Sequence, residues 1–534
     1  MTSLFLILIA VVILLCVGLN NVSARIGVPT LLAFIVLGMV FGNNGVFPLE
    51  FEDYDFAKET CTVALIFIMF YGGFGTRWEA VKPVMREATL LATVGVLLTA
   101  GLTGLFCHFA LGWNWIESFL MGSVVSSTDA ASVFSILRGK KLGLKNNTAP
   151  MLEVESGSND PCSYMLTALM LSIMKGTATG GGIAWMLIAQ VEFGLGFGFL
   201  IAWAARWAIE HVQIKGEGFD SLFILAVAIA SYALPDVMGG NGYLSTYIVG
   251  IVLGNSDIPN KKGLVNFFDG LTGLMQVLIF FLLGLLVWPA RLYKAILPAL
   301  AIFFFMWLVA RPLAVGSILG PFRKYPFKQR TLISFVGLRG AASIVFAIMA
   351  TVGNTMLEND LFNIVFCLVL ISIALQGSLI PTVSKKLDMI DADSNVMKTF
   401  NDYSEGTDMQ FGYIEVVAGG AWDNKLVKDL SLPRNLLVAL VLRGKERIIA
   451  KGDTMMQAGD QVVVVTKAFE DTTTSLVEKT VKEKGRHAGK AIKDVTSDGL
   501  VLLVKRNEES FIPNGDTVLY PGDQLVLLRN RPKA

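Results

Sequence analysis

Long apolar runs separated by short polar breaks fill the chain as far as about Val383. A run of ~20 apolar residues can cross a bilayer, and shorter runs occur inside helical bundles. Breaks at Gly, Pro and charged residues divide this region into about thirteen apolar segments. The segments are Leu4–Leu19, Pro29–Gly42, Cys61–Gly75, Ala88–Leu111, Ile116–Leu137, Ala149–Met174, Ile183–Ala208, Ser221–Leu234, Tyr243–Leu253, Phe267–Trp288, Ile296–Ile318, Thr331–Met349 and Leu361–Val383. This pattern predicts an all-α polytopic membrane domain over residues 1–385.

Basic residues are concentrated in every second loop between these segments. The basic loops contain Arg25; Arg77, Lys82 and Arg86; Arg138, Lys140, Lys141 and Lys145; Arg206 and Lys215; Lys261 and Lys262; Arg323, Lys324, Lys328 and Arg330; Lys385 and Lys386. The other loops contain only Lys58, Lys175, Arg291 and Lys294. Since cytoplasmic loops carry an excess of Lys and Arg, this alternation predicts an external N-terminus and a cytoplasmic C-terminal tail.

The composition supports a membrane protein and excludes some other classes. Hydrophobic residues make up 54% of the 534 residues and charged residues only 16%, which is unlike a soluble globular chain. A net charge of +1 gives no reason to expect a nucleic-acid partner. The five cysteines (Cys16, Cys61, Cys107, Cys162 and Cys367) show no metal-ligand spacing, so neither a metal centre nor a cofactor is predicted.

Ionisable residues inside the apolar segments are few and clustered. The cluster comprises Asp129, Glu153, Glu155, Asp160 and Arg339. Because a charge in a bilayer is costly, each is a functional hypothesis by default. A lone membrane arginine needs a carboxylate partner, so we expect Glu155 and Arg339 to form a structural ion pair. One arginine cannot neutralise four carboxylates, which leaves Asp160 and Asp129 as the candidates for function. The sequence leaves the role of Glu153 undecided.

Two segments carry signs of interrupted helices. The Ser/Thr run before Thr128 has hydroxyls that compete for backbone hydrogen bonds, and small residues surround Arg339. Pro161 cannot donate to the Gly157 carbonyl, so the helix loosens beside Asp160. Two interrupted helices, one in each half of the chain, indicate an inverted-repeat transporter with a site near the membrane midplane.

Four motifs carry a family resemblance. They are Gly27-Val-Pro-Thr-Leu-Leu-Ala-Phe-Ile-Val-Leu-Gly38, Thr128-Asp129, Glu155-Ser-Gly-Ser-Asn159-Asp160 and Gly337-Leu-Arg-Gly340. Together they resemble the electroneutral branch of monovalent cation/proton antiporters, of the bacterial NhaP type and the eukaryotic sodium/proton exchangers. The resemblance implies thirteen helices, a homodimer in the bacterial inner membrane, and a core domain that moves against a dimerisation domain.

The same resemblance implies roles for individual residues. Asp160 would bind both the cation and the proton, with Asp129, the Thr128 backbone and Ser156 as further cation ligands. Asn159, Glu155 and Arg339 would stabilise the core. Burial disfavours a charged carboxylate and a bound cation favours it, so proton and cation would compete for one site. Asn159 beside Asp160 suggests electroneutral 1:1 exchange. One departure from the family is Ala130, where Pro often follows the Thr-Asp pair.

After a polar linker, 386–410, the tail repeats itself. A shift of sixty-three residues aligns Leu437-Val-Ala-Leu-Val441 with Leu500-Val-Leu-Leu-Val504, and Gly459-Asp-Gln461 with Gly522-Asp-Gln524. Alternating apolar positions predict two small α/β modules, 411–470 and 483–531. They resemble the RCK_C (TrkA-C) ligand-binding module of regulators of K⁺ conductance. That resemblance implies regulation by an unidentified small ligand such as a nucleotide, and favours K⁺ over Na⁺.

Three other functions remain as alternatives. A Na⁺/H⁺ antiporter would need no change in residue types, because K⁺ and Na⁺ are separated by cavity size and ligand field. A K⁺ channel regulated by the tail would need a filter sequence such as Thr-Val-Gly-Tyr-Gly, and Thr351-Val-Gly-Asn354 does not replace it. An intramembrane aspartyl protease would also use two aspartates, but its Gly-x-Gly-Asp context is missing. The sequence therefore favours a K⁺/H⁺ antiporter.

Overall fold

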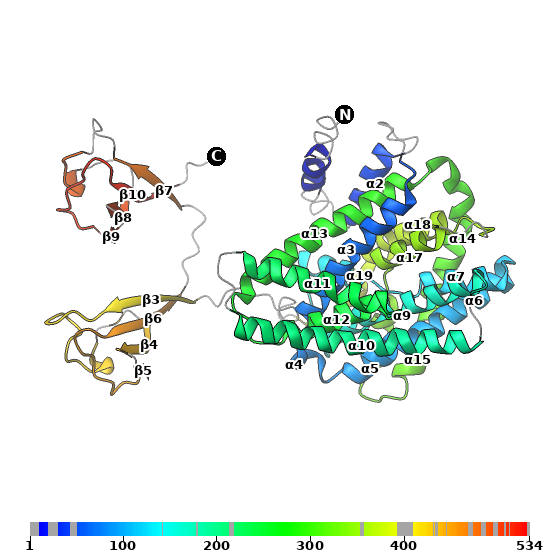
Figure 1. Ribbon diagram of the computed structural model, residues 1–534, viewed down its shortest axis with the longest axis horizontal. Helices are drawn as coiled ribbons and strands as arrows, with labels where there is room; N and C mark the ends of the chain where they lie inside the picture. The colour runs from blue at the N-terminus through cyan, green and yellow to red at the C-terminus, as the bar shows by residue number, and fades with distance from the viewer. Residues whose placement is uncertain are drawn as a thin grey trace. The chain divides into compact units, whose positions relative to one another are not determined.

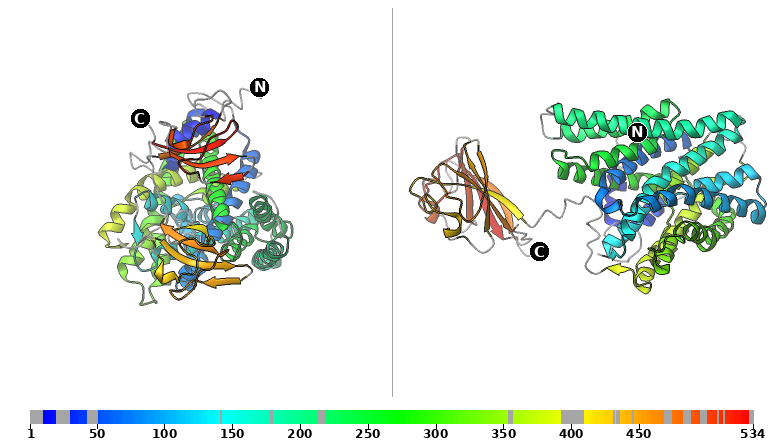
Figure 2. Two further views of the ribbon diagram at one scale, coloured as in Figure 1. Left: turned by 90° about the vertical axis from the view of Figure 1, so that its left-hand side faces the viewer. Right: turned by 90° about the horizontal axis from the view of Figure 1, so that it is seen from below.

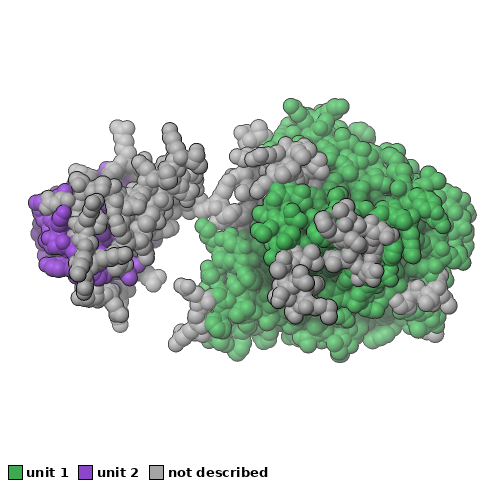
Figure 3. Space-filling model, turned by 90° about the horizontal axis from the view of Figure 1, so that it is seen from above, with its two compact units in different colours: residues 1–404 green, residues 405–534 purple. Residues whose placement is uncertain are grey.

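The computed structural model divides the chain into two compact units, residues 1–404 and 405–534 (Figure 3). It describes residues 10–19, 30–42, 51–140, 142–177, 180–212, 218–352, 357–391, 409–430, 432, 436–444, 446–467, 474–481, 488–494, 500–506, 509–511 and 513–530. Residues 4–9 of the first predicted helix and 392–408 of the predicted linker lie outside this set.

The first unit is a bundle of helices (Figure 1). After the helix Ala10–Leu19 come α2 (Thr30–Phe41), α3 (Tyr54–Gly75), α4 (Trp78–Val81), α5 (Met85–Leu90), α6 (Val96–Leu111), α7 (Trp115–Val124), α8 (Ala130–Gly139), α9 (Thr148–Met174), α10 (Gly180–His211), α11 (Phe219–Val237), α12 (Gly242–Gly254), α13 (Lys261–Leu286), α14 (Leu292–Phe305), α15 (Arg311–Leu319), α16 (Phe327–Phe335), α17 (Ala341–Thr351), α18 (Leu361–Ile371) and α19 (Ser378–Lys386). Each of the thirteen predicted segments has a helix, or consecutive helical pieces, as its counterpart among these described residues. Within the described ranges, seven continuous spans are long and apolar enough to cross a membrane, so the predicted all-α membrane domain is confirmed.

Three of the long spans contain a π-helical stretch. These stretches are η1 (Leu91–Gly95) between α5 and α6, η3 (Met306–Ala310) between α14 and α15, and η4 (Ser372–Gly377) between α18 and α19. A π-helical turn adds a residue to the helix and therefore rotates the side chains beyond it, and such turns are frequent at functional sites. Both η3 and η4 border the residues of the candidate site described below.

The helices pack in two sets. In one set, α12 contacts α3, α10 and α11, while α13 contacts α2 and α3. In the other, α9 contacts α5 and α7, α14 contacts α18, and α15 contacts α16. The right-hand view of Figure 2 shows α10 and α11 (teal to green) on the opposite side of the bundle from the yellow-green helices of residues 300–386.

Glycines allow the first set to pack closely. A Cβ atom on Gly38 of α2 would collide with the Phe281 carbonyl of α13, and one on Gly73 of α3 would collide with the Tyr247 carbonyl of α12. Small residues at helix contacts let backbones approach one another in a membrane, where packing replaces the hydrophobic effect. The two helix pairs therefore form tight units.

A two-stranded sheet joins the end of this unit to the loop between α8 and α9. β1 (Gly143–Leu144) pairs antiparallel with β2 (Ile390–Asp391). Lys145 Nζ lies 3.0 Å from the Asp388 carboxylate, and Met389 is buried. The chain that leads to the tail is therefore attached to the loop that connects α8 with α9.

The second unit contains two four-stranded antiparallel sheets with the same topology. The first has the order β3-β6-β4-β5 and the second β7-β10-β8-β9. Their strands are β3 (Met409–Glu415), β4 (Leu436–Arg443), β5 (Glu446–Ile449), β6 (Gln461–Lys467), β7 (Thr474–Thr480), β8 (Leu500–Arg506), β9 (Glu509–Phe511) and β10 (Gln524–Asn530). β7 precedes residue 483, where the sequence predicted the second module to begin, because its pairing with β10 is visible only in the fold.

The internal repeat is confirmed by equivalent ion pairs. Arg443 donates from Nε and Nη2 to the two oxygens of Asp460, at 2.8 and 2.7 Å. Arg506 does the same to Asp523, at the same distances. Each pair follows the sixty-three-residue shift. Both carboxylates are buried, and the hydrogen bonds from each arginine hold the pKa of its aspartate below the usual range.

These pairs predict the acid stability of the modules. Asp460→Asn removes a bidentate charge-assisted pair and should weaken the first module by about 1–3 kcal/mol. Since the pKa of Asp460 is lower in the folded state, the stabilisation is present above the unfolded pKa of about 3.9. It is lost as pH falls through the folded pKa. Hydrogen exchange of the full chain should show faster exchange in β4 and β6, with β8 and β10 unchanged.

Asp523→Asn is the matched control and should affect β8 and β10 instead. Unchanged protection of β4 and β6 in Asp460→Asn, at pH 7, would show that the ion pair contributes nothing to the module.

Candidate functional site

Two interrupted helices cross in the middle of the first unit. Residues 126–129 are extended between α7 and α8, and residues 337–340 are extended between α16 and α17. The Asp129 N–H donates to the Leu338 carbonyl at 2.8 Å, which joins the two extended stretches. A Cβ atom on Gly340 would collide with the Asp129 carboxylate, so the crossing requires glycine there. The predicted interruptions are both confirmed.

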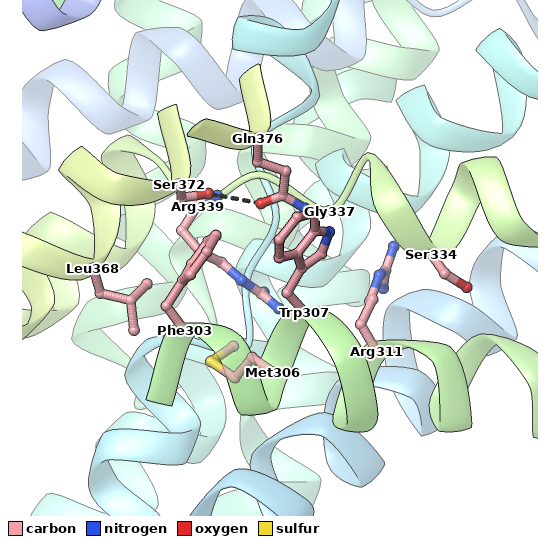
Figure 4. Close-up of a pocket in the computed structure, with 10 residues that line it drawn as sticks. All are labelled: Phe303, Met306, Trp307, Arg311, Ser334, Gly337, Arg339, Leu368, Ser372 and Gln376. Carbon is pink, nitrogen blue, oxygen red and sulfur yellow. Dashed lines mark hydrogen bonds between the residues drawn. The ribbon is translucent and has the colours of Figure 1, made fainter. Parts of the chain in front are cut away.

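Arg339 satisfies the backbone that the first interruption exposes. Its Nη1 donates to the carbonyls of Ser126 at 2.7 Å and Ser127 at 2.6 Å. Its own N–H donates to the Ser372 hydroxyl, which in turn donates to Gln376 at 3.0 Å (Figure 4). The π-helical stretch η4 supplies both of these polar residues. Arg339 is therefore fixed at its backbone and at its guanidinium.

The predicted Glu155–Arg339 ion pair is wrong. Glu155 of α9 instead pairs with Arg311 at the start of α15, with Oε1 and Nη2 2.5 Å apart. Both side chains are almost fully buried. The reason for the difference is that the broken helix at Ser126 and Ser127 occupies the Arg339 guanidinium. Figure 4 shows Arg311 and Arg339 approaching the same small cavity from different elements.

Arg311 was not predicted from the sequence, although a signal was present. It is a basic residue within the apolar segment Ile296–Ile318, and such a residue needs a buried partner. It follows η3 directly, so the π-helical turn helps to set the direction of its side chain. The described part of the core thus has two buried arginines, Arg311 and Arg339, rather than one.

Asp160 and Ser127 lie in direct contact at the crossing. The Ser127 hydroxyl donates to the Asp160 carboxylate. None of the ion pairs among the described residues involves Asp160, because both core arginines bind other groups. Asp160 therefore contacts a hydroxyl and the adjoining cavity rather than a basic side chain.

Hydrogen bonds attach the first interruption, residues 126–129, to α9 through Ser156, Asn159 and Thr128. The Ser156 hydroxyl donates to the Thr128 carbonyl at 2.7 Å and accepts from the Ala130 N–H at 2.9 Å. Asn159 donates to the Thr128 hydroxyl at 2.5 Å. A proline at position 130 would have no N–H to donate, so Ala130 adds a hydrogen bond here. The departure from the family pattern therefore leaves the crossing intact.

Asp129 caps the following helix. Its carboxylate accepts the Ser132 N–H at 3.1 Å and the Ser132 hydroxyl, an arrangement that satisfies a free N–H in the first turn of α8. The same carboxylate lines a cavity with Asp160 and Ser156. Of the predicted ligands, these three lie together at the cavity, while Thr128 and Asn159 are buried in the crossing behind it.

This cavity has a volume of about 510 Å³ and an acidic lining. Besides Asp129 and Asp160 it is lined by Glu153, which accepts a hydrogen bond from the Thr76 hydroxyl at 2.9 Å, and by Asp269. No Lys or Arg of the described residues lines it. Asp269, on α13, accepts from the Tyr71 hydroxyl at 3.0 Å. It was not predicted, although it stands near the start of the apolar segment Phe267–Trp288. An acidic cavity of this kind attracts cations.

The cavity extends toward one end of the bundle. Its lining comes from the last turns of α3, the first half of α8, the first half of α9 and the first half of α13. The nearby ends of α3, α9 and α13 adjoin loops of the basic set, which contain Arg77, Lys145 and Lys261, and α8 leads from the crossing to the loop that contains Lys145. Asp160 lies at the inner part of this space and Asp269 nearer to those loops.

The buried pair predicts a coupling between α9 and α15. Arg311→Met leaves the Glu155 carboxylate buried without its partner and should cost roughly 3–5 kcal/mol. Combining Arg311→Met with Glu155→Gln should recover part of that loss, since no charge is then left alone. Thermal unfolding of the purified variants in detergent measures the cycle. A matched cycle between Glu155 and Arg339 should be closer to additive, and an additive Glu155–Arg311 cycle would contradict the pairing.

Comparisons with known proteins agree with this geometry. The family model for the transmembrane sodium/hydrogen exchanger matches residues 10–386, and the TrkA-C domain model matches residues 412–468 and 476–532. A "K(+)/H(+) antiporter NhaP2" of Shewanella sp. (strain ANA-3) is 33% identical over 453 residues, which cover 84% of this chain and 78% of that protein. A "K(+)/H(+) antiporter NhaP" of Alkalimonas amylolytica is 32% identical over 469 residues, covering 87% and 81%.

Solved structures share the fold of the first unit. The sodium proton antiporter MjNhaP1 from Methanocaldococcus jannaschii at pH 8 superposes with a TM-score of 0.62 at 23% identity, over 72% of this chain and 99% of that chain. The chain therefore belongs to the sodium/hydrogen exchanger family, and it is a membrane-spanning cation/proton antiporter, not an enzyme, that carries two TrkA-C domains.

Proposed function

We propose that this chain exchanges K⁺ for H⁺, with Asp160 as the carboxylate that binds each in turn. The observation that carries the proposal is the position of Asp160. It lies at the crossing of two interrupted helices, lines an acidic cavity, and has a hydroxyl rather than a basic side chain as its partner. A proton or a monovalent cation can neutralise it equally well.

Asp129 and Ser156 would complete the cation site. Both line the cavity beside Asp160, and carboxylate, hydroxyl and carbonyl oxygens are suitable ligands for an alkali cation. The Thr128 carbonyl already accepts from Ser156 and has a second lone pair for a cation. Asn159 is neutral, so one charge would cross in each direction and the exchange would be electroneutral at 1:1. Asn159, Glu155 and Arg339 would keep the crossing in shape.

The sidedness of the cavity supports an inward-facing state. All of its lining lies toward loops of the basic set, which the positive-inside rule assigns to the cytoplasm. The N-terminus would then lie outside a bacterial inner membrane and the TrkA-C domains inside. The cavity lies between the two sets of helices, so their relative movement would close it and open another on the far side. Two copies joined through the α2, α3 and α10–α13 set would form the homodimer.

The choice of K⁺ rests on two supports. Relatives that match more than four fifths of this chain are named as K⁺/H⁺ antiporters, and these matches are longer than the membrane domain alone. TrkA-C domains, which resemble modules of K⁺ regulators, follow the antiporter domain here. The alternative is Na⁺/H⁺ exchange, which is the activity in the name of a Methanocaldococcus jannaschii relative with 26% identity over 352 residues.

The tail would regulate exchange rather than take part in it. Its modules lie outside the membrane domain, and they would bind a small ligand such as a nucleotide. The β1–β2 pair connects the chain before the tail to the loop between α8 and α9, the helices that carry or follow the site residues. A ligand could therefore shift transport by favouring one arrangement of that loop.

The proposed role of Asp160 predicts that Asp160→Asn abolishes exchange while the protein stays folded, because the amide cannot exchange a proton for a cation. Dequenching of a pH-sensitive dye in proteoliposomes, with K⁺ and Na⁺ added separately, measures the activity and ranks the ions. Asp257→Asn is the matched control, since that residue is exposed and lies outside the cavity. Substantial residual exchange in Asp160→Asn would remove Asp160 from the mechanism, and a preference for Na⁺ would select the alternative.

The proposed role of the tail gives a separate prediction. Deleting residues 405–534, with β2 retained, should preserve exchange and ion preference but change the ligand or pH dependence of the rate. The same assay on wild-type and shortened protein checks this. Loss of all exchange in a shortened protein that still folds, or retention of every regulatory response, would contradict a purely regulatory tail.

A further inference from the structure

A second cavity, separate from the acidic one, lies between α15 and α16 on the outer face of the bundle. Its volume is about 370 Å³. One wall is formed by Trp307, Leu308 and Gly316 and the other by Phe327, Arg330 and Phe335. Leu308 and Phe327 are among the most exposed large apolar side chains, at 61% and 74%. In a membrane-spanning unit, such a groove faces lipid.

The groove is polar at one end and apolar at the other. Arg330 and Gly316 are near the loop between α15 and α16, whereas Trp307 and Phe335 lie about two turns deeper along their helices. From Phe327 to Phe335 the helix rises about 12 Å. A cation above a narrow apolar channel of this length matches a phosphate headgroup above an acyl chain.

The arginine at the polar end has capacity for a ligand. Arg330 Nε is buried and donates no hydrogen bond to any described residue, and Arg330 is in none of the ion pairs of the described residues. Arginine binds phosphate through paired N–H donors. Lys328, in the first turn of α16, and Arg323, in the loop before it, are both exposed. Basic pockets between membrane helices at the cytoplasmic side are suited to anionic lipid headgroups.

A glycine of α15 provides space for a ligand. Gly316 lines the groove, and a Cβ atom on it would meet no atom within 4 Å. Absence of side chains on this face of α15 is what leaves the groove open. A larger residue at Gly316 would fill the groove without colliding with the helices themselves.

We propose that this groove binds one anionic phospholipid of the leaflet nearest the loop 320–326, with its phosphate on Arg330 and an acyl chain between α15 and α16. The groove borders the transport core, because Trp307 and Ser334 line both it and the small cavity at Arg311 and Arg339 (Figure 4). α16 leads directly into residues 337–340, the second interruption at the crossing. A bound lipid therefore stabilises α16, the helix that precedes the crossing.

The test is thermal unfolding of the full-length protein in detergent with added phosphatidylglycerol, phosphatidylcholine or inorganic phosphate. Phosphatidylglycerol should raise the melting temperature of the wild-type protein more than phosphatidylcholine does, and phosphate alone should have no effect. Arg330→Gln should weaken the response to phosphatidylglycerol by roughly fivefold in concentration, as expected for the loss of one basic contact. Gly316→Leu should abolish it by filling the groove.

Matched controls distinguish the groove from general effects. Lys328→Gln removes an equal charge from the same helix, α16, outside the groove, and Gly101→Leu places the same side chain at another open glycine, on α6. Both should respond to phosphatidylglycerol as the wild type does. Gly316→Leu keeps the test decisive if Arg330→Gln does not fold.

Several outcomes would overturn the proposal. Equal responses to the two lipids would show that no anionic headgroup is recognised, and an equal response to phosphate would show a soluble anion site. Equal responses of Arg330→Gln and Lys328→Gln would remove Arg330 from the site. A Gly316→Leu protein whose oligomeric state changes would show that a second copy, rather than a lipid, covers the groove.

Discussion

Backbone left without helical hydrogen bonds at membrane depth must be satisfied by the protein itself, and the whole core depends on how this chain does it. Lipid offers no partner for a free carbonyl or N–H, so irregular backbone is tolerated only where it is buried in protein or lines a water-filled space. Arg339 binds the carbonyls of Ser126 and Ser127, and the Asp129 N–H binds the Leu338 carbonyl. The two interrupted helices thus satisfy one another.

The distribution of charge follows from that solution. Arg339 is occupied by carbonyls, so Glu155 takes Arg311 as its partner. With both core arginines engaged, Asp160 keeps only the Ser127 hydroxyl and the cavity. The acidic lining from Asp129, Glu153 and Asp269 then makes the cavity favourable for a cation. In the proposed mechanism, Asp160 is available for exchange because neither Arg311 nor Arg339 pairs with it.

Much of this arrangement is predictable from the sequence. The features that were not predicted depend on contacts between distant parts of the chain. The apolar segments and the weak helical propensity around Thr128 and Arg339 are local properties, and both are confirmed. The partner of Glu155 is not local. It depends on which groups reach Arg339 in three dimensions, and on a π-helical turn at Met306–Ala310 that precedes Arg311. Arg339 binds backbone carbonyls, and every residue has a carbonyl, so the sequence contains no particular residue type that would reveal this partner.

Other features become visible only when helices are placed together. Asp269 is one acid in an apolar segment, and its relation to Asp160 appears only once α13 forms the opposite wall of the cavity. Likewise, β7 is a strand by virtue of its pairing with β10, so the start of the second module cannot be read from its own residues. The repeated Gly-Asp turns of the tail, by contrast, are local, and they correctly place Asp460 and Asp523 in equivalent positions.

The central claim is that one carboxylate binds either a proton or a cation. The most direct measurement is proton release when K⁺ is added to the purified full-length protein in weakly buffered detergent solution. Competition predicts up to one proton released per chain. The apparent Kd for K⁺ should rise about tenfold for each unit of pH below the range in which the site is deprotonated. Binding of K⁺ without proton release, and with an affinity independent of pH, would contradict the account.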